Sequence, residues 1–326
     1  MTPFCNEKRR EPAGASAPGG IADEARRVMT AEQALSRALR RPRYEIIPMR
    51  GALEAVRALP AHAVVTVTCS PTRGIDATVE LAAQVAALGH VAVPHLAARR
   101  FASRSHLETG MSRLTEAGVR DVFVVGGDGD HVAGPFDHGC RLIEALAEIA
   151  PGLRSVGVPC YPEGHALIAA EALDEALDAK CFLAGHMVTQ LCFDAARIRD
   201  WLQGVRGRGV DLPMHVGIPG VIERRRLLGI ALRIGLGDST RFLRGNKRMW
   251  GRLTGPSQFT PDALLDDLAP LLAAPELNVA GLHINTFNQV DNTEAWRRKR
   301  LSTLASTAGD VDASGSPSSA APDGRA

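Results

Sequence analysis

DVFVVGGDGD, residues 121–130, is the stretch that decides the fold. Val122–Val125 is a short apolar run, mostly β-branched, which is typical of a strand buried on both faces. Gly126 and Gly127 end that strand, because glycine lets the backbone turn or approach a ligand closely. Asp128 follows at once, and α/β folds carry their chemistry at the carboxyl ends of such strands. On this stretch alone, a functional carboxylate and a simple cap of the next turn are equally good interpretations of Asp128.

Runs of the same kind recur along the chain, with helical stretches of 3.6-residue apolar spacing between them. The eight predicted strands are Tyr44–Ile47, Val64–Thr68, Val91–His95, Val122–Val125, Ser155–Val158, Met187–Gln190, Met214–Gly217 and Val279–Ile284. Most intervals between them have the length of one βα unit. The pattern predicts an α/β fold of the (β/α)8 TIM-barrel type in a single domain. A doubly wound open sheet is the alternative, and the absence of GxGxxG after the first strand counts against it.

Helix signals accompany the strands. Asp194 is predicted to cap a helix N-terminus, and Ser105 with Glu108 has the spacing of a capping box. Gly89 and Gly118 follow helical stretches as C-terminal caps. A first helix is expected at Ala22–Leu39, and three successive helices are expected before the last strand, at Arg224–Ile234, Ser239–Lys247 and Pro261–Leu272.

Both ends of the chain are predicted to lie outside the barrel. Residues 1–22 are rich in Pro, Gly, Ala and charge, and residues 306–326 are mostly small residues without apolar periodicity. Such segments do not bury enough apolar surface to fold, so two flexible tails are expected. The barrel domain is therefore expected at residues 23–305.

Composition narrows the class of protein. A net charge of +2 gives no drive towards nucleic acid or an anionic membrane, and no apolar run is long enough to span a bilayer. The N-terminus has no secretory signal, and six cysteines without CxxC spacing indicate reduced thiols. The ten histidines show no HxH or HxxxH spacing within a predicted element, so no metal site is expected. We expect a cytoplasmic protein that acts on small molecules.

The active site of a barrel lies at the carboxyl ends of its strands, so the residues there are the candidates. Glu45 lies within the first strand, where an unpaired buried charge is costly. It is therefore a functional candidate, unless Arg43 or Arg50 neutralises it from outside. The other strand ends carry Thr68, His95, Asp128, Tyr161, His165, Gln190 and Gln289.

Three of these residues also have a structural interpretation that stays open. His95 could be a histidine that fills the barrel, and His165 could cap the following helix. Gln190 could bond neighbouring strand-end backbone without touching a substrate.

Seven short motifs at these strand ends resemble those of the methylenetetrahydrofolate reductase family. YEIIP (44–48) resembles the family's FEFFP, VTVTCSP (65–71) its VSVTYG, PHL (94–96) its PHL, VVGGD (124–128) its LRGD, YPEGH (161–165) its YPEVHP, TQLCFD (189–194) its TQFFFD, and INTFN (284–288) its YTLN. The resemblance runs from about Tyr44 to Asn288. Because the motifs occur in the family's order, the chain is identified as a member.

The resemblance implies an enzyme that reduces 5,10-methylenetetrahydrofolate with hydride from NAD(P)H. It gives Glu45 the role of general acid towards the leaving nitrogen of the methylene bridge, and burial is expected to raise the pKa of that carboxyl. It implies that Asp128 contacts the pterin and lies beside the redox centre, and that Gln190 and Gln289 contact the folate. The residues implied for the cofactor pocket are Thr68, His95, Tyr161, His165 and Lys180.

Most members of the family also hold FAD, using the arginine of LRGD. That position is Gly126 here, and residues 166–179 contain only acidic polar residues, whereas a flavin pyrophosphate needs cationic or N–H partners. We therefore expect FAD to bind weakly or to be absent. In the second case the nicotinamide passes its hydride to the folate directly.

Three functions stay open at this point. The first is reduction of 5,10-methylenetetrahydrofolate, and the second is oxidation of 5-methyltetrahydrofolate in a demethylation pathway by the same site. The third is a non-catalytic folate-binding paralogue, against which the retained Glu45, Asp128 and Gln190 argue.

Overall fold

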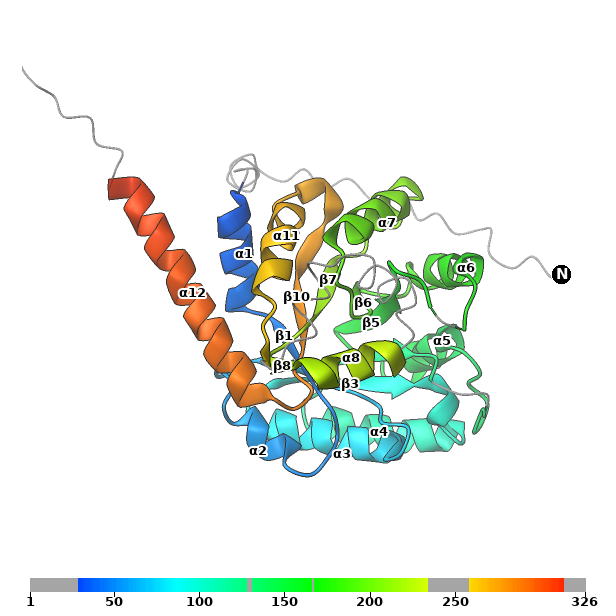
Figure 1. Ribbon diagram of the computed structural model, residues 1–326. Coiled ribbons are helices and arrows are strands. Elements are labelled where there is room, and N and C mark those ends of the chain that lie inside the picture. The colour runs from blue at the N-terminus through cyan, green and yellow to red at the C-terminus, as the bar shows by residue number, and fades with distance from the viewer. Residues whose placement is uncertain (1–28, 128–130, 166, 234–257, 314–326) are drawn as a thin grey trace, which may run out of the picture.

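The computed structural model describes residues 29–127, 131–165, 167–233 and 258–313. Eight parallel strands close into a barrel in the order β1-β10-β7-β6-β5-β4-β3-β2. Helices surround the strands in a ring (Figure 1). The predicted (β/α)8 TIM barrel is therefore confirmed.

The barrel strands lie within two residues of their predicted positions at nearly every end. They are β1 (Arg43–Ile46), β2 (Val64–Val67), β3 (Val91–Ala97), β4 (Asp121–Val125), β5 (Ser155–Cys160), β6 (His186–Thr189), β7 (Met214–Pro219) and β10 (Val279–Asn285). The helices are α1 (Ala31–Arg40), α2 (Ala52–Val56), α3 (Gly74–Ala87), α4 (Arg104–Glu116), α5 (Gly139–Ile149), α6 (Ala170–Lys180), α7 (Ala195–Gly207), α8 (Arg224–Arg233), α11 (Asp262–Leu272) and α12 (Val290–Ala313), with short 3-10 turns at Ala98–Arg100 and Pro275–Leu277.

Two helix starts differ from the prediction. The helix α4 begins after Ser103, whose extended backbone lets its side chain accept from His106 N, so Ser103 is the cap in place of Ser105. The helix α1 begins at Ala31, because Thr30 forms a capping box with Gln33, and the part of the predicted helix before residue 29 lies outside the described residues. The predicted cap at Asp194 is confirmed, since its carboxylate accepts from two backbone N–H groups of α7.

The connection between β7 and β10 is an insertion at the carboxyl end of the barrel. Strand β8 (Ile222–Glu223) pairs antiparallel with β9 (Gln258–Phe259), a small sheet that the sequence did not predict. The helix α8 follows β8 and contacts this sheet, whereas α11 packs against α1 and α7 in the ring. The helix predicted at 239–247 lies outside the described residues.

The chain stays helical beyond the expected end of the domain. The helix α12 runs to Ala313, so it includes the first residues of the segment predicted as a tail from residue 306. Its N-terminal half packs against α1 and α2, and its C-terminal half projects past the ring in Figure 1. None of the described helices combines the length and apolarity that crossing a membrane requires.

The barrel has two different cores. Between strands and helices lies one large apolar cluster, while inside the barrel the apolar part is small, centred on Val93, Phe123 and Val188. Alternate residues of every strand point inward, and many of these inward residues are polar. Inward histidines come from four strands: His95, His186, His215 and His283.

The amino-terminal end of the barrel interior forms a floor of Arg43, Ser155, His186 and His215. Arg43 Nη1 lies 3.4 Å from His215 Nε2, and Ser155 Oγ lies 3.0 Å from His186 Nδ1. Burial lowers the pKa of His186 to about 3 and that of His215 to about 2, with the charge of Arg43 acting in the same direction. Gly157 provides the necessary space, since a Cβ there would lie 2.4 Å from His186 Nε2.

Candidate active site

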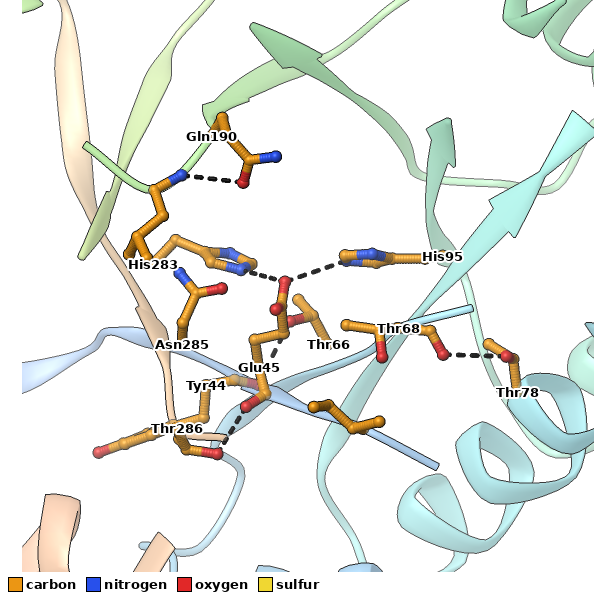
Figure 2. A network of polar contacts seen from close by, with 12 residues as sticks. Tyr44, Glu45, Thr66, Thr68, Thr78, His95, Gln190, His283, Asn285 and Thr286 are labelled. Carbon is orange, nitrogen blue, oxygen red and sulfur yellow. Dashed lines mark hydrogen bonds and ion pairs between the residues drawn. The ribbon is translucent and has the colours of Figure 1, made fainter. Parts of the chain in front are cut away.

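Glu45 points into the barrel from β1, between two imidazoles. His283 Nε2 on β10 lies 2.9 Å from Glu45 Oε2, and His95 Nε2 on β3 lies 3.8 Å from the same oxygen. Figure 2 shows the two rings on opposite sides of the carboxylate. The Glu45 side chain keeps 19% of its surface exposed while that of His283 keeps 3%. The carboxylate is therefore reachable from solvent, whereas its histidine partner is sealed in.

The pKa of Glu45 is lowered, contrary to the expectation from burial alone. Burial does raise it, but the hydrogen bond from His283 and the electrostatic interactions with His283 and His95 outweigh burial. For His95 burial dominates and lowers its pKa to about 4, so this ring is neutral near neutral pH. The resting site thus holds an ionised carboxylate beside neutral His95.

The backbone of Glu45 is fixed by the loop between β10 and α12. Thr286 donates to Glu45 O through both its backbone N and its Oγ1, at 3.2 and 2.6 Å. The Asn288 side chain accepts from Ile47 N at 2.8 Å and donates to Ile47 O at 3.0 Å. Phe287 and Asn288 both have left-handed φ values, 49° and 62°. Strain of this kind persists where surrounding contacts over-determine the backbone, and it is common at functional sites.

The predicted substrate-contacting amides lie on separate strand ends. Gln190 follows β6, and its Oε1 accepts from Leu191 N at 3.0 Å, so its amide nitrogen is the end left for other contacts. Gln289 stands at the start of α12, where its Oε1 accepts from Asn292 Nδ2 at 3.2 Å. Asp128 lies outside the described residues.

The five residues predicted to line a cofactor pocket come from four separate parts of the chain. His95 is buried inside the barrel and stacks on Phe123, with ring centroids 4.6 Å apart. Tyr161 and His165 do pack together, edge to face at 5.3 Å. The helix-capping alternative for His165 is wrong, because its Nδ1 accepts from Leu167 N, ahead of the start of α6.

Thr68 and Lys180 come from other parts of the barrel. Thr68 follows β2, and its carbonyl accepts from Thr78 Oγ1 at 3.0 Å. Lys180 reaches towards the start of α5, where its Cδ is 3.9 Å from the point a Cβ on Gly139 would occupy. Burial lowers the pKa of Lys180, and the thiols of Cys140 and Cys160 are the charges that act on it. Cys160 belongs to the core between strands and helices, so Lys180 faces that layer.

His283 is the functional candidate that the strand ends alone did not reveal. It lies two residues before the end of β10, and the strand ends were the positions considered. The available signal was the period of two in VAGLHIN, which puts Gly281, His283 and Asn285 on one face of a strand whose other face is apolar. A histidine on the inner face of a barrel strand is a candidate partner for a carboxylate on the adjacent strand.

Fold and site together define a (β/α)8-barrel protein with an acid–base pair near the carboxyl ends of its strands. A sequence profile described as methylenetetrahydrofolate reductase matches residues 49–230, which is more than half of the 326 residues. The chain belongs to the methylenetetrahydrofolate reductase family, as its motifs predicted. The matched segment begins after β1 and ends within α8, so Glu45 and His283 lie outside it.

One solved structure is similar to the chain as a whole. It is described as a "putative lyase/mutase from Burkholderia cenocepacia J2315", is 15% identical in sequence, and gives a TM-score of 0.42. The similarity covers 90% of this chain and 92% of that one.

The family is generally flavin-dependent, so the described residues can be tested for fit to FAD. The flavin pyrophosphate requires cations or free N–H groups, yet Lys180 faces the helix layer and His95 is engaged with Glu45. A Cβ at Gly126 would meet nothing within 4 Å, so the position of the family arginine is open space. Among the described residues of the predicted cofactor set, neither Lys180 nor the neutral His95 supplies the cation that a flavin pyrophosphate requires.

Within the same residues, no group of three His, Cys, Asp or Glu side chains has the arrangement of a metal site.

Proposed function

We propose that the protein reduces 5,10-methylenetetrahydrofolate to 5-methyltetrahydrofolate with NAD(P)H. The observation that carries the proposal is Glu45, an ionisable carboxyl that is held by His283 inside the barrel and still open to solvent. A folding role does not require such a group, because an apolar residue would fill the space without the penalty of burying a charge.

The reaction needs one proton and one hydride. Substrate, NAD(P)H and one H⁺ give 5-methyltetrahydrofolate and NAD(P)⁺. Glu45 in its acid form donates the proton to the leaving nitrogen of the five-membered ring, whose C–N bond breaks to leave an iminium. The hydride then forms the new C–H bond of the methyl group. Two electrons pass from the nicotinamide to the folate, and no covalent enzyme intermediate is needed.

The remaining residues position the substrate in this proposal. The amide nitrogen of Gln190 and the side chain of Gln289 contact the folate, and Asp128 accepts from the pterin N–H groups. The edge-to-face pair of Tyr161 and His165 offers a flat aromatic surface for a ring of the nicotinamide nucleotide. Thr68, at the end of β2, lines the same side. Gly126 in place of the family arginine and Lys180 facing the helix layer support a route in which the hydride goes directly from nicotinamide to folate.

A second candidate is oxidation of 5-methyltetrahydrofolate by the same site. The lowered pKa of Glu45 favours it, since this direction needs a base to take the proton as the ring closes. An ionised resting carboxylate is ready for that role, whereas reduction first requires a proton to be taken up.

The test is an anaerobic assay of the full-length protein in both directions with NADH and with NADPH. Replacing the acid, Glu45→Gln, is expected to lower turnover at least about 100-fold while the protein still binds folate. The control is Glu54→Gln, which changes an 80% exposed carboxylate on α2 and leaves the rate unchanged. Full activity of Glu45→Gln refutes the role of Glu45. Folate binding without nucleotide oxidation in the unmodified protein supports the non-catalytic paralogue.

The visible spectrum of the purified protein tests the hydride route separately. A colourless protein that turns over supports direct transfer. A yellow protein whose bound flavin is reduced by NAD(P)H refutes it.

A further inference from the structure

Among the described residues, the one hydrogen bond to the Glu45 carboxylate comes from His283. Its Nε2 lies 2.9 Å from Oε2, within hydrogen-bond range, whereas His95 at 3.8 Å is beyond it. No hydrogen bond within the described part of the chain involves Oε1. The two carboxylate oxygens of Glu45 are therefore not equivalent: Oε2 is hydrogen-bonded to His283 on β10, and Oε1 has no hydrogen-bond partner among the described residues.

The tautomer of His283 follows from its burial. Its Nδ1 is buried and has no hydrogen-bond partner among the described residues. A proton on Nδ1 would leave an N–H group without an acceptor in the barrel interior, which is unfavourable. Nε2 therefore carries a proton, which is donated to Oε2.

The imidazole is enclosed by its surroundings in the barrel. The side chain is 3% exposed, and its ring lies 6.4 Å from that of His95, centroid to centroid. It stands on a strand whose register pairs His283 with Arg43 of β1 and with Gly217 of β7. The donor is thus preorganised, and the carboxylate is held without reorganisation during turnover.

We propose that His283 is a positioning residue for Glu45, which fixes Oε2 and leaves Oε1 as the oxygen that exchanges the proton with the substrate. This inference rests on the proposed function, because it assigns a proton transfer to Glu45. It also makes His283 the group that keeps Glu45 ionised between turnovers.

The other charged groups near Glu45 do not replace His283 in that role. From β3, His95 faces the same oxygen but is neutral, since burial lowers its pKa to about 4. From β1 itself, Arg43 faces the interior two residues earlier and lies next to His215. Removal of His283 therefore leaves burial as the dominant influence on Glu45, and burial raises the pKa of a carboxyl.

The test compares three variants of the full-length protein by their pH profiles. In the reduction direction the rate falls as Glu45 loses its proton, so kcat/KM decreases with rising pH. In His283→Leu this decrease is expected to move to higher pH by at least about one unit, with kcat lowered about tenfold or more and KM for folate changed less than about threefold. His283→Asn serves the same purpose if the leucine variant does not fold, because its amide is too short to reach Oε2.

The matched control is His283→Gln, whose amide N–H can take the place of the Nε2–H. It is expected to restore a pH profile close to that of the unmodified protein. An unshifted profile in His283→Leu or His283→Asn overturns the proposal, and so does a glutamine variant that behaves like leucine.

A second readout separates this inference from the proposed function. Infrared difference spectra against Glu45→Gln report the C=O stretch of protonated Glu45 as the pH is lowered, with no substrate present. The band is expected to appear at higher pH in His283→Leu than in the unmodified protein. If the unmodified protein lacks folate reduction but shows this shift, the proposed function fails and the pairing stands. If the band appears at the same pH in both, the pairing fails whatever the activity.

Discussion

Replacing Glu294 by alanine would remove the centre of a buried network that ties α12 to β1. Glu294 accepts from Tyr44 Oη at 2.8 Å and from Arg297 Nε and Nη2 at 2.7 Å each. Arg298 Nε adds a further bond at 2.8 Å from the surface. The side chains of Glu294 and Arg297 are 3% and 7% exposed. Tyr44 precedes Glu45 and faces the opposite side of β1, so this network fixes the strand that carries the acid.

The magnitude follows from what the alanine leaves behind. Arg297 would keep its bond to Leu39 O but lose its carboxylate, and the Tyr44 hydroxyl would lose its acceptor. Breaking a buried pair by removing one partner typically costs about 3–5 kcal/mol. At about 2–3 °C per kcal/mol for a chain of this size, the melting temperature is expected to fall by about 6–15 °C. Thermal unfolding followed by circular dichroism at neutral pH measures it.

The control removes a charge from the same network at the surface. Arg298 is 65% exposed, so Arg298→Ala is expected to change the free energy of unfolding by less than about 1 kcal/mol. A Glu294→Ala protein that unfolds within about 1 kcal/mol of the unmodified protein would show that the network contributes little, and the reasoning would be wrong.

Three further substitutions test other parts of the structure. Gly157→Ala puts a Cβ 2.4 Å from a histidine nitrogen inside the barrel and is expected to destabilise the fold by about 1–3 kcal/mol in urea unfolding, whereas Gly204→Ala, with nothing within 4 Å, should be neutral or stabilising. Asn288→Ala removes two bonds to Ile47, so unfolding should need about 1–3 kcal/mol less and kcat should fall with it; an unchanged kcat would mean that the loop does not hold the acid. Burial raises the pKa of Glu163 to about 7, so the folded state binds this proton more tightly than the unfolded state does. The free energy of unfolding is therefore expected to decrease as the pH rises from about 5 to 8. In Glu163→Gln this decrease should be smaller by about 2–4 kcal/mol, as measured by urea unfolding at both pH values.

Strands were the best-predicted part of the fold, for a physical reason. A strand covered on both faces must be continuously apolar, so Val122–Val125 and its counterparts stand out without knowledge of the rest of the chain. The eight-fold alternation then permits few topologies other than a closed barrel. Helix starts were less certain, because a cap such as Ser103 depends on one backbone conformation that a neighbouring serine could equally adopt.

The site could be predicted only in part. Glu45 could be identified because burying a carboxylate within an apolar strand is costly, which indicates a function for it. Its partner could not, because His283 is 238 positions away and meets Glu45 only through closure of the barrel between β1 and β10. The error in the direction of the Glu45 pKa has the same origin. Burial of Glu45 can be inferred from one strand, but the hydrogen bond that outweighs burial joins side chains of two strands.

The floor of the barrel has a consequence for how protons are supplied. Burial lowers the pKa of Arg43 to about 10, so its guanidinium stays charged near neutral pH. A proton on His186 or His215 would lie beside that charge, and their pKa values near 3 and 2 make protonation there unfavourable by several kcal/mol at neutral pH. The amino-terminal end of the barrel interior is therefore a poor source of protons for Glu45. In the proposed reduction, Glu45 would therefore take up its proton from the carboxyl-terminal side before folate and nucleotide bind, and would return to the ionised form after each turnover.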